Sequence, residues 1–117
     1  MADVLFGDRS PAGRLPVTFY ESVSQLPPFA DYAMEGRTYR YFRGQPLYPF
    51  GHGLSYTRFE YSGLKLSETR VGASDGVEVS LDERNVGARH GDEVVQLYAR
   101  DVEAKAPAPL RELRGFE

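Results

Sequence analysis

Short stretches of alternating apolar and polar residues predict β-strands in the second half of the chain. Val77, Val79 and Leu81 alternate with acidic and hydroxyl-bearing neighbours, which is typical of a strand with one buried face. Residues 93–100 are more apolar and indicate a central strand, and residues 110–116 supply a further one. Because turn-forming residues separate these stretches, they favour an antiparallel arrangement.

A change of phase marks the first strand of this half. Phe59 and Tyr61 alternate in one phase, and Leu64 and Leu66 alternate in the opposite phase. Gly63 lies at the change, where a bulge or bend would shift the side chains from one face to the other. We therefore predict one strand that is interrupted at Gly63.

The first half of the chain is predicted to be largely irregular. Six of the 8 prolines lie there, and its ordered pieces are short. Residues 4–6 fit the end of a helix or strand, residues 15–19 a short strand with an edge proline, and residues 37–42 an extended, aromatic-rich segment. No apolar periodicity indicates an amphipathic helix of more than three turns.

The run over residues 46–57, Pro-Leu-Tyr-Pro-Phe-Gly-His-Gly-Leu-Ser-Tyr-Thr, is the most distinctive feature of the sequence. Its two prolines fix φ and lack a backbone donor, and its two glycines permit positive φ, so neither a helix nor a central strand fits. Apolar side chains between these residues indicate a structured connector. The run resembles the segment that joins the second and third domains of family 3 glycoside hydrolases.

Further stretches in the same order resemble that family. Residues 2–8 and 11–19 resemble the end of its second domain, an α/β sandwich, and residues 34–42 resemble the segment that follows. Residues 85–87 and 91–98 resemble its fibronectin type III-like third domain. Residues 113–116 match the next landmark of that domain. The segment Gly36-Arg37-Thr38-Tyr39-Arg40 leans towards the β-xylosidase-like members rather than the β-glucosidases.

The resemblance implies a mainly β chain with three parts. Residues 1–20 would be the end of the α/β sandwich domain, residues 21–57 the Pro/Gly-rich connector, and residues 58–117 a fibronectin type III-like, immunoglobulin-like antiparallel sandwich. Such sandwiches have about seven strands, and we find three or four, so a partial sandwich that ends before its later strands is expected. An apolar face and a strand edge would then lack partners.

The function implied by the resemblance is that of a glycoside hydrolase cleaving terminal β-linked xylosides or glucosides. In that family the nucleophilic aspartate and the acid/base glutamate lie ahead of the stretch matched here, so no catalytic, cofactor-binding or metal-binding residue is assigned. We expect a non-catalytic C-terminal part that acts as scaffold, has the remaining domains of its enzyme as partner, and needs no cofactor. Self-association through an open strand edge is a further expectation.

The alternative is a stand-alone carbohydrate-binding module. Eight aromatic residues fall within residues 39–61: Tyr39, Tyr41, Phe42, Tyr48, Phe50, Tyr56, Phe59 and Tyr61. Flat exposed aromatics stack on sugars, whereas packed aromatics fill domain interfaces and cores, and we favour the packed interpretation. Arg37, Arg40 and Arg43 alternate with them and could pair with carboxylates of the other domains.

Composition narrows the partners. The net charge of -3 favours neither nucleic acid nor an anionic membrane. The absence of cysteine excludes disulfides and thiolate sites, and no apolar run is long enough to cross a membrane. Residues 1–8 lack the features of a signal peptide. The cellular compartment stays open, and a periplasmic or secreted enzyme is compatible with the resemblance.

Several carboxylates, two histidines and one serine are candidates for catalytic groups. Asp31 and Glu35 are spaced for one helical face, but the surrounding proline and glycine disfavour a helix there, and Asp92 and Glu93 are adjacent and would face opposite sides of a strand. His52 is expected to be a turn residue. His90 is expected to be solvated, and Ser55 lacks the flanking glycine of a nucleophile elbow.

Overall fold

The computed structural model describes residues 1–104 and 107–117, and these form two compact units. The first unit combines residues 1–11 with residues 55–93, and the second combines residues 12–54 with residues 94–117. Each unit therefore joins an early segment of the chain to a late one. The boundaries predicted after residues 20 and 57 are domain limits along the chain, which these contact-based units do not test, so they stay a prediction.

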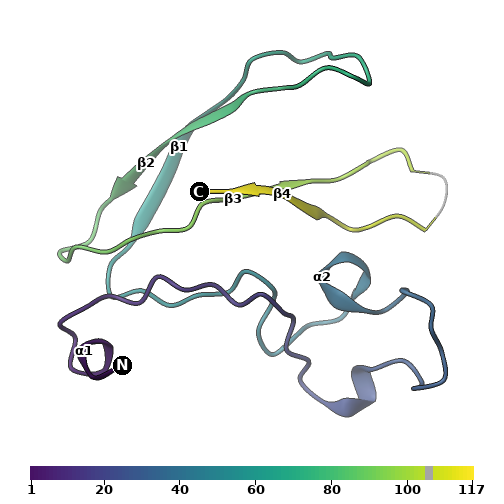
Figure 1. The fold of residues 1–117 in the computed structure, drawn as a ribbon, viewed down its shortest axis with the longest axis horizontal. Helices are drawn as coiled ribbons and strands as arrows, with labels where there is room; N and C mark the ends of the chain where they lie inside the picture. The colour runs from purple at the N-terminus through teal and green to yellow at the C-terminus, as the bar shows by residue number, and fades with distance from the viewer. Residues whose placement is uncertain (105–106) are drawn as a thin grey trace. The chain divides into compact units, whose positions relative to one another are not determined.

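In the first unit, helix α1 (Ala2–Leu5) precedes an antiparallel pair of strands, β1 (Phe59–Leu66) and β2 (Val79–Asn85) (Figure 1). The register runs from Phe59 opposite Asn85 to Leu66 opposite Val79, and it shifts between Ser62 and Lys65. Gly63, with φ of +63°, lies inside this shift. The strand interruption predicted at Gly63 is thus confirmed, because the left-handed backbone that a bulge requires is open to glycine.

The second unit contains the 3₁₀ helix η1 (Val23–Gln25), helix α2 (Thr38–Tyr41) and the hairpin of β3 (Gln96–Ala99) with β4 (Glu112–Phe116). Gln96 lies opposite Phe116 and Ala99 opposite Glu112, with a shift between Leu97 and Tyr98. The connector pairs with the earlier segment through an isolated bridge between Phe19 and Tyr48. Residues 46–57 hold no helix or regular strand, as predicted.

Four predicted elements need correction, the first being the strand predicted over residues 15–19, which is reduced to the single bridge at Phe19. The extended segment over residues 37–42 is wrong, because Tyr41 and Phe42 donate helical hydrogen bonds to the carbonyls of Arg37 and Thr38. The strand predicted over residues 93–100 is shorter, because β3 spans only Gln96–Ala99. Backbone pairing extends before it only as far as Val95, which exchanges hydrogen bonds with Glu117. The strand predicted from Val77 to Leu81 begins at Val79 and continues to Asn85.

The described residues contain no fully buried side chain. Leu64 and Leu66 of β1 are more than half exposed, and Val79 and Leu81 of β2 are only partly covered. The described part has little helix and two antiparallel two-stranded sheets. Its apolar strand faces are largely uncovered, as expected from the sequence. Within the described ranges, no helix is long and apolar enough to cross a membrane.

Candidate functional site

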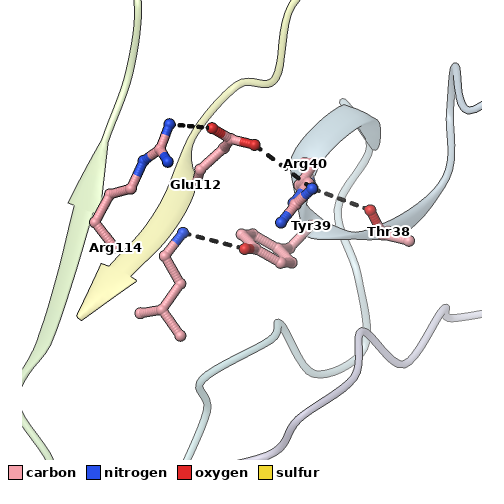
Figure 2. A network of polar contacts seen from close by, with 6 residues as sticks. Thr38, Tyr39, Arg40, Glu112 and Arg114 are labelled. Atoms are coloured by element: carbon pink, nitrogen blue, oxygen red, sulfur yellow. Dashed lines mark hydrogen bonds and ion pairs between the residues drawn. The ribbon is translucent and has the colours of Figure 1, made fainter. Parts of the chain in front are cut away.

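The densest polar network of the second unit centres on Tyr39 in helix α2. The hydroxyl oxygen of Tyr39 accepts a hydrogen bond of 3.1 Å from the backbone N–H of Leu113 in β4 (Figure 2). The N–H of Leu110 donates to the carbonyl of Arg40. We call this contact between α2 and β4, made by Tyr39, Arg40, Glu112 and Leu113, the Tyr39 junction.

Ion pairs extend the junction along β4. Glu112 lies between two guanidinium groups, with Arg40 at 3.5 Å and Arg114 at 2.6 Å from its carboxylate oxygens (Figure 2). The side chain of Glu112 is 26% exposed, so water screens these pairs only in part. Glu112 therefore serves as a bridge between the helix and the strand.

Aromatic rings pack behind the junction. The rings of Tyr39 and Phe50 stack with centroids 4.2 Å apart, and Tyr98 of β3 meets Tyr39 edge to face at 6.1 Å. Offset stacked and edge-to-face pairs are the favourable geometries for aromatic rings. The connector residue Phe50 is thereby joined to both α2 and β3.

The two tyrosines of this cluster have pKa values displaced in opposite directions. Burial raises the pKa of Tyr39, but the hydrogen bond from Leu113 and the positive charge of Arg40 outweigh it, so the net pKa lies below the ordinary value. Burial raises the pKa of Tyr98, and the nearby Arg111 guanidinium opposes this in part. The fold therefore stabilises the ionised form of the Tyr39 side chain more than that of Tyr98.

Two hollows adjoin the cluster within the second unit. One has a volume of about 410 Å³ and is lined mainly by apolar groups, among them Pro16, Val17, Tyr20, Met34 and Phe50. The other has a volume of about 500 Å³ and includes Arg100 and Arg111 in its walls. Thr18 and Tyr39 border both. The Oγ1 atom of Thr18 is buried and has no hydrogen-bond partner among the described residues.

The carboxylates considered as catalytic candidates do not form pairs in the structure. Asp31 and Glu35 lie in irregular chain rather than on a helix, and Asp31 Oδ1 accepts a hydrogen bond from the N–H of Ala33. Glu93 accepts a hydrogen bond of 2.8 Å from the Tyr61 hydroxyl. In the described ranges, no group of three or more histidine, aspartate or glutamate side chains is arranged to hold a metal ion.

The two histidines and Ser55 lie in turns or irregular chain. The His52 N–H donates to the carbonyl of Pro49, as predicted for a turn residue, and its ring lies 5.2 Å from that of Tyr48. His90 is exposed. Ser55 exchanges a hydrogen bond of 3.0 Å with Ser10 Oγ in the first unit, and its own Oγ accepts from the N–H of Thr57.

The arginines predicted to seek carboxylates on other domains are partly satisfied within the chain. Arg40 pairs with Glu112, and Arg37 donates to three backbone carbonyls in residues 28–33. Pairing of these arginines with carboxylates of other domains therefore stays a prediction. Sequence reasoning missed Glu112, Arg100 and Arg111. Their positions on one hairpin were the only available signal.

Two family descriptions match the chain. Residues 1–56 match the "Glycosyl hydrolase family 3 C-terminal domain", and residues 93–117 match the "Fibronectin type III-like domain". Among curated proteins, a xylan 1,4-β-xylosidase of Xylanibacter ruminicola is 49% identical over all 117 residues, which span 13% of that protein. A periplasmic β-glucosidase of Salmonella typhimurium is 42% identical over the whole chain, which spans 17% of it.

A solved structure is similar over nearly the same extent. β-Glucosidase 3B of Thermotoga neapolitana, in complex with α-D-glucose, superposes with a TM-score of 0.85 at 36% identity. The match covers 99% of this chain and 18% of that one. The chain thus spans less than a fifth of the length of each of these three proteins.

Proposed function

The chain is a homologue of the C-terminal region of family 3 glycoside hydrolases of the β-glucosidase and β-xylosidase type, and we propose that it is a structural, non-catalytic part of such an enzyme. The enzyme hydrolyses terminal β-linked xylosides or glucosides. The remaining domains of that enzyme are the partner of this chain. The named activities of its relatives, which are a β-xylosidase and β-glucosidases, support this substrate class.

The use of Glu112 is the observation that carries the scaffold role. A glycosidase needs a free carboxylic acid and a second carboxylate at a defined separation. In the candidate site, both oxygens of Glu112 are engaged by Arg40 and Arg114, and the junction joins a helix to a strand. This carboxylate supports the packing of α2 on β4.

The domain assignment forms part of the proposal. Residues 1–20 end the α/β sandwich domain, residues 21–57 form the connector, and residues 58–117 belong to a fibronectin type III-like sandwich. The two antiparallel sheets and the fibronectin type III-like match over residues 93–117 support this assignment. The uncovered apolar faces of the strands are the surfaces that further strands and domains would cover.

We expect no hydrolysis of aryl β-xylosides or aryl β-glucosides by the chain alone. The test is a chromogenic assay at high protein concentration, compared with a buffer blank and with the Glu112→Gln variant. Turnover that rises in proportion to chain concentration would contradict the scaffold proposal. Turnover that Glu112→Gln abolishes would assign the chemistry to the junction itself.

A carbohydrate-binding surface is the second candidate function, and one loop favours it. Phe29 and Tyr32 are 96% and 89% exposed, and the Arg37 guanidinium holds the backbone of this loop through three carbonyls. Exposed aromatics on a loop fixed in this way could stack on neutral sugars. Several aromatic rings of residues 39–50, by contrast, pack on other rings of the second unit.

Under the scaffold proposal, we expect xylo- and cello-oligosaccharides to leave the tyrosine fluorescence unchanged. The comparison uses the Phe29→Ala/Tyr32→Ala double variant, with Phe6→Ala as control because Phe6 is also strongly exposed but lies in the first unit. Saturable quenching that is lost in the double variant and kept in the control would establish the binding module instead.

A further inference from the structure

The larger of the two hollows in the second unit is lined by positively charged side chains and by no negatively charged ones. Its volume is about 500 Å³, within the range of small-molecule sites. Its walls include Thr18, Tyr39, Phe42, Arg100, Leu110 and Arg111, and none of its lining residues is acidic. We call it the arginine hollow.

The two arginines flank the last residue pair of the hairpin, and both line the same hollow. Ala99 of β3 pairs with Glu112 of β4, so the next positions outward along the antiparallel pair are Arg100 and Arg111. Two arginines that line one hollow repel each other unless a negative charge lies near them. Neither arginine forms an ion pair with a carboxylate of the described residues. An anion between them would remove this repulsion.

A second observation points into the same hollow. The Oγ1 atom of Thr18 is buried without a hydrogen-bond partner in the described part of the chain, although buried hydroxyls are normally satisfied. Thr18 lines the arginine hollow and also borders the smaller one, so a ligand that displaces the atoms covering this hydroxyl would gain its hydrogen bond. The Arg111 guanidinium lies 5.1 Å over the ring of Tyr98, which limits the freedom of this side chain before any ligand arrives.

We propose that the arginine hollow binds a carboxylate, and that its ligand is an acidic sugar of the uronic acid class. Planar guanidinium groups hold carboxylates through paired hydrogen bonds. Phe42 and Leu110 supply apolar surface for the C–H face of a pyranose ring. The carboxylate assignment rests on the hollow alone, whereas the choice of a sugar rests on the proposed function in a glycoside hydrolase.

The test is a titration of the isotope-labelled 117-residue chain with glucuronate, followed in proton–nitrogen correlation spectra at low salt. We expect the amide peaks of Arg100, Arg111 and their neighbours to shift and saturate on the order of millimolar, because both arginines are exposed. Raising the salt should weaken the shifts. Glucose should leave these peaks in place, and acetate should bind at least about tenfold more weakly than glucuronate.

Charge variants locate the binding. Arg100→Gln and Arg111→Gln should each weaken glucuronate binding about tenfold or more, which corresponds to the loss of one charge-assisted contact. Arg84→Gln is the matched control, because it removes the same charge from β2 in the first unit. Arg111→Lys retains the charge without the planar fork and provides a milder change should the glutamine variant lose its dispersed spectrum.

Several outcomes would overturn the proposal. The carboxylate site is refuted if glucuronate shifts no peaks of the hollow, or if Arg84→Gln weakens binding as much as the hollow variants do. Acetate binding as tight as that of glucuronate would refute the acidic-sugar assignment. Hydrolysis of aryl glycosides by the chain would contradict the scaffold role but would leave these shifts unaffected, so the two failures are distinguishable.

Discussion

Replacing Gly51 by alanine is expected to lower the free energy of unfolding of the second unit by about 3 kcal/mol. Gly51 has φ of +81°, a backbone conformation that costs an L-residue roughly 1–2 kcal/mol. A Cβ atom at this position would also meet Gln96 Oε1 and, at 2.8 Å, the Tyr98 hydroxyl. The strain and the contact act together, so the effect should exceed that of either alone.

The contact matters because Gln96 is part of a hydrogen-bonded chain. Its Nε2 donates to the Gly51 carbonyl at 3.1 Å, and its Oε1 accepts from the Tyr98 hydroxyl at 2.6 Å. A methyl group on residue 51 would force Gln96 away and break both hydrogen bonds, each worth about 1 kcal/mol. The connector would then lose its polar contact with β3.

Gly13→Ala is the matched control for this prediction. Gly13 belongs to the same unit, has no positive φ, and would place its Cβ more than 4 Å from any other group. We expect its effect to stay within about 0.5 kcal/mol. Urea unfolding of both variants measures the difference, and equal stabilities would show that the connector does not hold β3 through Gly51.

The sequence reveals elements whose causes are local. The change of apolar phase around Gly63 marked a bulge, because a two-residue period can shift only where the backbone inserts an extra residue. Residues 46–57 were recognised as a connector because proline and glycine restrict the backbone whatever surrounds them. The strand at residues 112–116 lies within the stretch 110–116 that the sequence predicts as a strand.

Helix α2 could not be predicted in this way. Its aromatic and β-branched residues favour extended structure locally. The helical turn is held instead by distant partners: the Tyr20 hydroxyl accepts from the N–H of Thr38, and the N–H of Leu110 donates to the Arg40 carbonyl. Tertiary contacts thus override the propensity of the four residues.

The candidate sites depend on juxtapositions that appear only with the register. Arg100 and Arg111 are separated by a loop and become neighbours only once Ala99 is known to pair with Glu112. Tyr39 and Leu113 are 74 positions apart in the chain. The sequence therefore identified the two strands of the hairpin, but neither helix α2, nor the arginine hollow, nor the Tyr39 junction.

The Tyr39 junction leads to the second large effect. Replacing Tyr39 by alanine should destabilise the second unit by about 3 kcal/mol, because it removes a ring that packs on Phe50 and Tyr98 and leaves the Leu113 N–H without its acceptor. Replacing Tyr39 by phenylalanine keeps the ring and removes only the acceptor. The smaller change should therefore cost about 1 kcal/mol.

Amide hydrogen exchange separates these two contributions at a single residue. In Tyr39→Phe, the Leu113 amide should exchange several-fold faster, while amides of β1 and β2 in the first unit keep their rates. In Tyr39→Ala, the whole of β4 should lose protection, because the ring stack that supports α2 is gone as well. Tyr41→Phe is the matched control, since Tyr41 lies in the same helix and its hydroxyl has no hydrogen-bond partner in the described ranges. If Tyr39→Phe left the exchange of the Leu113 amide unchanged, the hydrogen bond that joins α2 to β4 would contribute nothing to the stability of this unit.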